Sequence, residues 1–330
     1  MAHPMRRLFA LLLSCLIATA TIGQSGMPAE TRNAALRYWM AFAEMHDPPA
    51  DKSIADLLEK TAAGEAPWDE AKLGPILDEN AGAIRMMQRA SKLPDCDWGN
   101  DYSEGAQASI AYLPRGRVLA RLNTLYGMRL AVKGDTEGAV ETWLDGIRFS
   151  QDMAKGGTLI FALIGSTAML SNLHALAQEA QSGKFDAAQK KRIESAMRAV
   201  PETGFDWGRA MRMEELVIEA TVRHMSQAAD PAAYYREVWG KPAPADFSVP
   251  TAADIAQFHR VMEAGEAAFE LPPDAARAKL TAIEAEVKAL QPILRETVPS
   301  YARENDVRFK VQAQRQELLQ ALATKNDSSR

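Results

Sequence analysis

Residues 120–153 constrain the fold of this chain more than any other stretch. They read ARLNTLYGMRLAVKGDTEGAVETWLDGIRFSQDM, and two apolar patterns of helical period flank Gly134 and Asp135. Apolar residues that recur every three or four positions mark one face of an α-helix. Small residues, among them Gly127 and Ala139, stand where two such helices would have to touch. The segment therefore predicts a hairpin of two closely packed helices.

Helical signals continue through the rest of the chain. Residues that favour helices are abundant, and few stretches show the apolar–polar alternation of strands. We therefore expect an all-α protein whose helical hairpins pack as a short solenoid or an irregular bundle. The helix expected over residues 158–181 is the least polar and should lie at the centre, because a helix that is apolar all round is normally buried. Pro75 should divide or kink the helix expected over residues 68–91.

The N-terminus carries the pattern of an export signal. Arg6 and Arg7 precede an apolar run over residues 8–17, and a small-x-small cleavage site follows at residues 18–20. A run of about ten residues is shorter than the ~20 that cross a bilayer as a permanent helix. We expect residues 1–20 to be cleaved and the mature protein to be periplasmic or extracellular, without a stable membrane span. Retention of the segment as an anchor is the alternative.

Composition shifts divide the remaining chain. Residues 241–250, KPAPADFSVP, resemble a linker because proline interrupts helical pattern there. We expect a main helical-hairpin body over residues 26–240, a C-terminal helical segment over residues 251–323, and a disordered tail over residues 324–330.

Charge and cysteine content exclude several classes of function. The chain has 38 Lys and Arg against 43 Asp and Glu, and the two signs are interspersed. A nucleic-acid partner is not expected, since it would need a concentrated basic face. The chain has two cysteines, of which Cys15 lies in the signal. Cys96 alone cannot form zinc, haem or iron–sulfur motifs, so no cofactor or metal is expected. We expect Cys96 to be buried beside Trp98 rather than to act as a nucleophile.

The hairpin segment resembles a tetratricopeptide repeat. The resemblance covers about residues 120–153 and depends on Gly127, the Gly134-Asp135 turn, Ala139 and Trp143. Gln151 stands where the repeat usually has its closing proline, and no tandem copies at a 34-residue period flank the segment. More broadly, the chain resembles exported helical proteins of environmental bacteria, which implies no activity.

The leading functional expectation is a binding or scaffold protein of the cell envelope. The tetratricopeptide resemblance implies a concave groove, and grooves of this kind take peptides or partner helices. We expect a protein or peptide partner and no catalytic residues. The groove is expected to include Tyr126, Arg129, Trp143 and Arg148.

The alternative is a helical envelope hydrolase or lyase that uses clustered carboxylates. Glu215 and Glu219 are four residues apart and share a helical face, and Asp97 is a further acid. The loop around residue 97 forms a possible acidic site, which consists of Asp95, Asp97, Asp101 and Glu104. A pocket that gathers two carboxylates with shifted pKa values would favour this alternative.

Overall fold

The computed structural model describes residues 31–323, and all regular elements in that range are helices. They comprise fourteen α-helices and one 3₁₀-helix, and the one β-type contact recorded there is an isolated bridge between Asn33 and Asp95. The all-α expectation is confirmed. From Asn33 onward the chain forms one compact unit. The expected signal at residues 1–20 and the expected tail at residues 324–330 lie outside the described residues.

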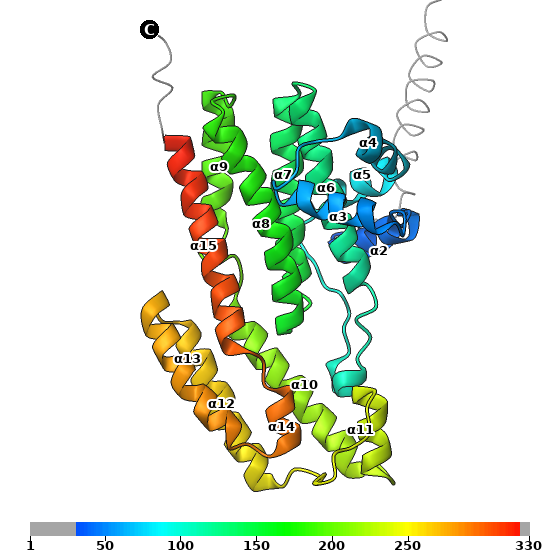
Figure 1. The fold of residues 1–330 in the computed structure, drawn as a ribbon, viewed down its shortest axis with the longest axis vertical. Coiled ribbons are helices and arrows are strands. Elements are labelled where there is room, and N and C mark those ends of the chain that lie inside the picture. Colours follow the sequence, from blue (N-terminus) through cyan, green and yellow to red (C-terminus); the bar gives the residue numbers. More distant parts are fainter. Residues whose placement is uncertain (1–30, 324–330) are drawn as a thin grey trace, which may run out of the picture. The chain divides into compact units, whose positions relative to one another are not determined.

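Three long helices form the centre of the fold. They are α6 (Leu113–Val132), α7 (Thr136–Ala154) and α8 (Leu159–Gln181). Helix α7 packs against both α6 and α8, and α8 also contacts α10 and α15 (Figure 1). Asp135 caps α7 by accepting a hydrogen bond from the Gly138 amide, as the Gly134-Asp135 turn predicts. The central position expected for the helix over residues 158–181 is confirmed.

Glycines permit α7 to approach its two neighbours closely. A Cβ atom on Gly127 of α6 would lie only 2.4 Å from Nε1 of Trp143, and one on Gly146 of α7 would lie 2.5 Å from Oδ1 of Asn172. Trp143 donates its indole N–H to the carbonyl oxygen of Thr124 at 3.1 Å. Because the large side chain of one helix fills the place of a missing Cβ, the helices interlock at these points.

Helix α8 is long and apolar enough to cross a membrane, judged by length and composition, and is the one such helix among residues 31–323. In this fold 56% of its most apolar window is buried by other parts of the protein. A buried core helix meets the same criterion, and α8 contacts α6, α7, α10 and α15.

The N-terminal helices surround one end of this centre. They are α2 (Ala34–Glu44), α3 (Lys52–Ala62), α4 (Glu70–Glu79) and α5 (Ala81–Ala90), followed by the 3₁₀-helix η1 (Tyr102–Gln107). Side chains of Asn33, Asp51 and Asp69 cap α2, α3 and α4 by accepting from free backbone amides. Arg115 of α6 donates to the carbonyl oxygens of Phe42 and Met45, which ties the end of α2 to α6.

The break in the helical pattern over residues 68–91 lies at Asn80 rather than at Pro75. Pro75 is accommodated inside α4. Asn80 ends that helix because its buried side chain donates to the carbonyl oxygen of Ile76 and accepts from the amide of His46. A short amide side chain that bonds to the backbone in this way competes with the helical hydrogen bonds. The expectation placed on Pro75 is therefore corrected.

An aromatic cluster fixes the loop over residues 92–101 against the centre. The rings of Trp98 and Tyr112 stack with centroids 4.4 Å apart, and Tyr38 also stacks on Trp98. Asp152 of α7 joins the cluster, since its carboxylate accepts from the Tyr38 hydroxyl at 2.7 Å and its carbonyl accepts from the Trp98 indole at 2.7 Å. Lys155 pairs with the same carboxylate.

The C-terminal helices cover the other side of α8. They are α9 (Ala187–Ala199), α10 (Trp207–Gln227), α11 (Pro231–Trp239), α12 (Ala252–Phe269), α13 (Pro273–Lys288), α14 (Pro292–Thr297) and α15 (Tyr301–Ala323). Residues 241–250 contain no helix, and a capping box of Thr251 and Asp254 opens α12. Helix α15 lies along α8 (Figure 1), so the segment over residues 251–323 packs on the body and shares its core.

Replacement of Gly127 by alanine should destabilise the protein. The added methyl group would overlap the buried Trp143 ring, and overpacking of this kind costs about 1–3 kcal/mol. We expect Gly127→Ala to lower the free energy of unfolding by that amount, less up to about 1 kcal/mol of helix propensity, in urea titrations followed by circular dichroism. Gly208→Ala is the matched control, since a Cβ there is 3.4 Å from its nearest contact and the substitution gains up to about 1 kcal/mol of helix propensity. Equal stability of the two variants would contradict the interlocking of α6 and α7.

Candidate functional site

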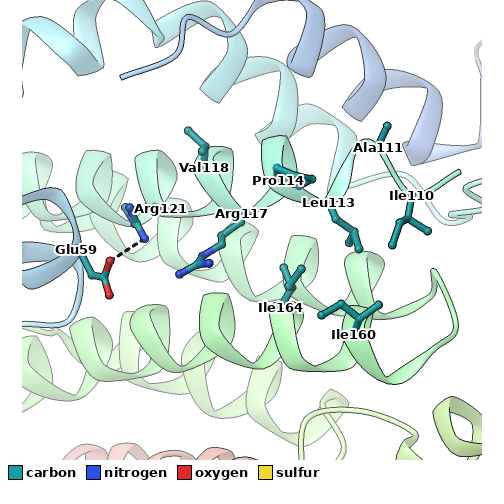
Figure 2. A pocket seen from close by; sticks show the side chains of 10 residues that line it. All are labelled: Glu59, Ile110, Ala111, Leu113, Pro114, Arg117, Val118, Arg121, Ile160 and Ile164. Carbon is teal, nitrogen blue, oxygen red and sulfur yellow. Dashed lines mark ion pairs between the residues drawn. The ribbon is translucent and has the colours of Figure 1, made fainter. Parts of the chain in front are cut away.

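An open cleft of about 760 Å³ lies between α6 and α8 (Figure 2). Helix α6 forms one wall, the first turns of α8 form the other, and Glu59 of α3 stands at one end. The residues that line the cleft are Glu59, Ile110, Ala111, Leu113, Pro114, Arg117, Val118, Arg121, Ile160 and Ile164.

Most of the cleft surface is aliphatic. On α6, Leu113 or Pro114, then Arg117 or Val118, then Arg121 recur every three or four residues and so share one face. Ile160 and Ile164 are four residues apart on α8 and face this wall (Figure 2). The side chains of Ile110 and Ile160 are 37% and 42% exposed. Large apolar side chains that remain accessible in a concave site are typical of binding surfaces.

Two arginines make one end of the cleft positive. Arg121 lies 3.5 Å from Glu59, whose side chain is 67% exposed. Burial lowers the pKa of Arg121, Glu59 raises it, and the charge of Arg117 lowers it further. Arg117 extends into the space between α6 and α8 (Figure 2) and forms no hydrogen bond or ion pair with any residue in the described part of the chain. Two guanidinium groups against one carboxylate leave this end positive, so it favours an anion.

The cleft continues as a narrower cavity of about 150 Å³ next to α3. Hydroxyl groups of Thr124, Thr167 and Ser171 occur along it. Each of them donates to the carbonyl oxygen four residues earlier in its own helix, at 3.1–3.2 Å. These hydroxyls are therefore already satisfied, and Arg117 is the cleft arginine without a partner in the described part of the chain.

A second cavity of about 390 Å³ lies further along the same pair of helices. The loop between α3 and α4 contributes Trp68, α6 contributes Met128 and Val132, and α8 contributes Ala175 and Gln178. From the start of α6 to its end, the cavities are lined by successively later residues of α8, from Ile160 to Gln178. The two helices therefore run parallel and share one continuous outer face.

The four groove residues expected from the sequence lie at different places in the structure. Trp143 is 2% exposed in the core and borders the second cavity with one edge. Arg129 pairs with Glu70 and Asp78 of α4. Tyr126 lines a polar depression that Asp145 of α7 also borders, and Arg148 forms an ion pair with Asp145 at 2.9 Å. None of the four lines the α6–α8 cleft.

The acidic loop residues have local structural contacts. Asp97 accepts from the Gly99 amide, and Asp101 caps η1 by accepting from the Ser103 amide. The backbone carbonyl of Asp95 accepts from the Ala34 amide, and Glu104 is exposed in η1. Within residues 31–323 no group of three or more His, Cys, Asp or Glu residues is arranged to hold a metal ion.

Glu215 and Glu219 of α10 flank His259 of α12. The Nε2 atom of His259 lies 2.7 Å from a Glu219 oxygen, and Nδ1 contacts Glu215. These three side chains join α10 to α12. Asp97, by contrast, bonds to Asn33 at the start of α2.

Other titratable groups with shifted pKa values lie away from the cleft. Burial raises the pKa of the Cys96 thiol, and the nearby Asp152 raises it further, so Cys96 is a weak nucleophile. Burial also raises the pKa of Glu214, which accepts from the Leu159 amide at the start of α8. Glu304 of α15 is 4% exposed, and burial raises its pKa to about 7.

The sequence contains part of the signal for the cleft. Arg117 and Arg121 are four residues apart in a helix that was expected, so they could be placed on one face. Their partner wall could not be recognised, because Ile160 and Ile164 lie on a helix that is apolar on every side. Periodicity does not show which apolar residues of such a helix remain exposed.

Replacement of Glu304 by glutamine should make stability less dependent on pH. The folded protein keeps this proton up to about pH 7, whereas the unfolded chain releases it near pH 4.5. Wild-type stability therefore falls as pH rises through that window, by up to about 3 kcal/mol, and then stays level. We expect Glu304→Gln to stabilise the protein at pH 8 and to have little effect at pH 4 in denaturant titrations. The exposed Glu286→Gln is the control, and equal effects of Glu304→Gln at both pH values would contradict the assignment.

Comparison of the chain with protein-family models, with curated proteins and with solved structures finds no match. The case for a function therefore depends on the cleft itself, on its aliphatic walls and on its arginines.

Proposed function

We propose that this protein is a binding protein of the cell envelope that recognises a peptide or protein partner through the α6–α8 cleft. The observation that carries the proposal is an open aliphatic cleft with a cation, Arg117, that has no partner among residues 31–323. An unpaired cation beside exposed aliphatic side chains suits a partner with apolar groups and a negative charge. The Ile110 and Ile160 side chains supply apolar area that a partner would bury.

The composition of the cleft favours binding over catalysis. Its one carboxylate, Glu59, pairs with Arg121, and no His, Cys, Ser or Thr lines the main cleft. A catalytic site needs a nucleophile or a water-activating base within reach of a second acid or base. The hydrolase or lyase alternative would have to use Glu215, Glu219 and His259, which join α10 to α12 and do not line the cleft.

Loss of cleft contacts should abolish partner binding. We expect immobilised full-length protein to retain a partner from envelope extracts, and Ile160→Asp to reduce that retention at least tenfold in quantitative mass spectrometry. An aspartate there would bring an unpaired charge into the buried interface. Leu216→Asp is the matched control, since Leu216 is 51% exposed on α10 outside the cleft. Equal retention by Ile160→Asp and wild type would contradict the assignment of the cleft.

Export is the second part of the proposal and depends on the basic and apolar pattern over residues 6–20. After expression in a Gram-negative host, we expect osmotic shock to release the protein with a new N-terminus directly after Ala20. N-terminal sequencing of the released protein measures this. Recovery of an intact N-terminus from the spheroplast fraction would contradict cleavage and release.

A further inference from the structure

We infer that the partner segment in the α6–α8 cleft is an amphipathic α-helix with an aliphatic stripe and an acidic residue at one end of that stripe. The inference rests on the proposed function and specifies the class of ligand. It follows from three properties of the cleft: the hydrogen-bonding state of its walls, its length and openness, and the charge at its α3 end.

The walls offer almost nothing to a peptide backbone. Apart from Ile110 and Ala111, which precede α6, they are helices α6 and α8, whose main-chain groups beyond the first turn bond within each helix. The hydroxyls of Thr124, Thr167 and Ser171 in the adjoining cavity are also occupied. An extended peptide would lose water from its backbone groups and find no partners for them, which is unfavourable. A helix satisfies its own backbone, so only its side chains need to fit.

The dimensions of the cleft suit two turns of such a helix. The α6 wall extends from Leu113 to Arg121, nine residues that span about 12 Å. Aliphatic side chains one turn apart on the partner would lie over Leu113 with Ile160, and over Val118 with Ile164. The cleft is accessible from solvent at Ile110 and Ile160, which are 37% and 42% exposed. A small ligand such as a fatty acid is usually buried over most of its surface, whereas a helix keeps its polar face in solvent.

The positive charge at the α3 end of the cleft favours an acidic residue in the partner. Two guanidinium groups, Arg117 and Arg121, face one carboxylate, Glu59, and that carboxylate is mostly exposed. The surplus positive charge is local, because the whole chain has a formal net charge of −5. An aspartate or glutamate of the partner would form charge-assisted hydrogen bonds with Arg117, which has no other partner in the described chain.

Selection from a peptide library tests this inference. The probe is a displayed library of random peptides of about 16 residues, long enough to form a helix, selected on the full-length protein. We expect the enriched sequences to carry aliphatic residues at i, i+3 or i+4, and i+7, with an acid beyond one end. A proline placed within the stripe should weaken binding at least tenfold.

Charge reversal provides the matched measurement. Arg117→Glu should weaken the binding of the selected peptides about tenfold. A lysine in place of the peptide's acid should restore binding to that variant. Arg223→Glu is the control, because Arg223 is exposed on α10 and does not line the cleft. Ile160→Asp reports whether binding occurs in the cleft at all.

The outcomes separate the inference from the proposed function. Peptides that bind in the cleft but have alternating patterns, tolerate proline or ignore Arg117→Glu would overturn the helix inference and leave the binding function intact. If no peptide shows binding that Ile160→Asp abolishes, both fail. Binding of palmitate that Ile160→Asp abolishes, without any peptide, would identify a lipid ligand and overturn both.

Discussion

The close approach of α7 to α6 and α8 is the constraint on which the rest of the structure depends. The Trp143 ring occupies the position of an absent Cβ on Gly127, and Asn172 does the same at Gly146. Helices α6 and α8 both pack on α7 and contact each other, so they lie side by side. They also run in the same direction. Their shared outer face forms the walls of the cleft, so the proposed binding surface is a consequence of packing in the core.

The cleft also depends on what covers that face and what does not. Helix α3 packs on α6 and closes one end with Glu59, while α15 and α10 cover other sides of α8. In the first turns of α8, Ile160 and Ile164 line the cleft opposite Arg117 and Arg121 of α6. A surface of this kind combines apolar area, which provides affinity, with an unpaired charge, which provides selectivity. Neither property requires a nucleophile, a metal or a shifted carboxylate in the cleft.

Local sequence signals predicted most of the helices, because caps and turns act over a few residues. Asp135 caps α7 at the expected Gly134-Asp135 turn, and Gly127 lies at a close helix contact, as the hairpin pattern predicts. Pro75 misled the prediction, since it fits within α4 while Asn80 breaks the pattern through long-range bonds. The cleft was missed because it depends on which faces of α6 and α8 remain uncovered. That is decided by helices distant in sequence, which composition and periodicity do not place.

Methyl NMR with a soluble nitroxide measures whether the α6–α8 cleft is open in solution. Isoleucine methyl signals of the full-length protein would be assigned, and their attenuation by the nitroxide compared. An open cleft predicts strong attenuation of the Ile110 and Ile160 methyl signals. It predicts little attenuation for Ile147 and Ile193, which are 2% and 0% exposed in the core. If the methyl groups of Ile110 and Ile160 were as protected as those of Ile147 and Ile193, the cleft would be closed in solution and the account would be contradicted.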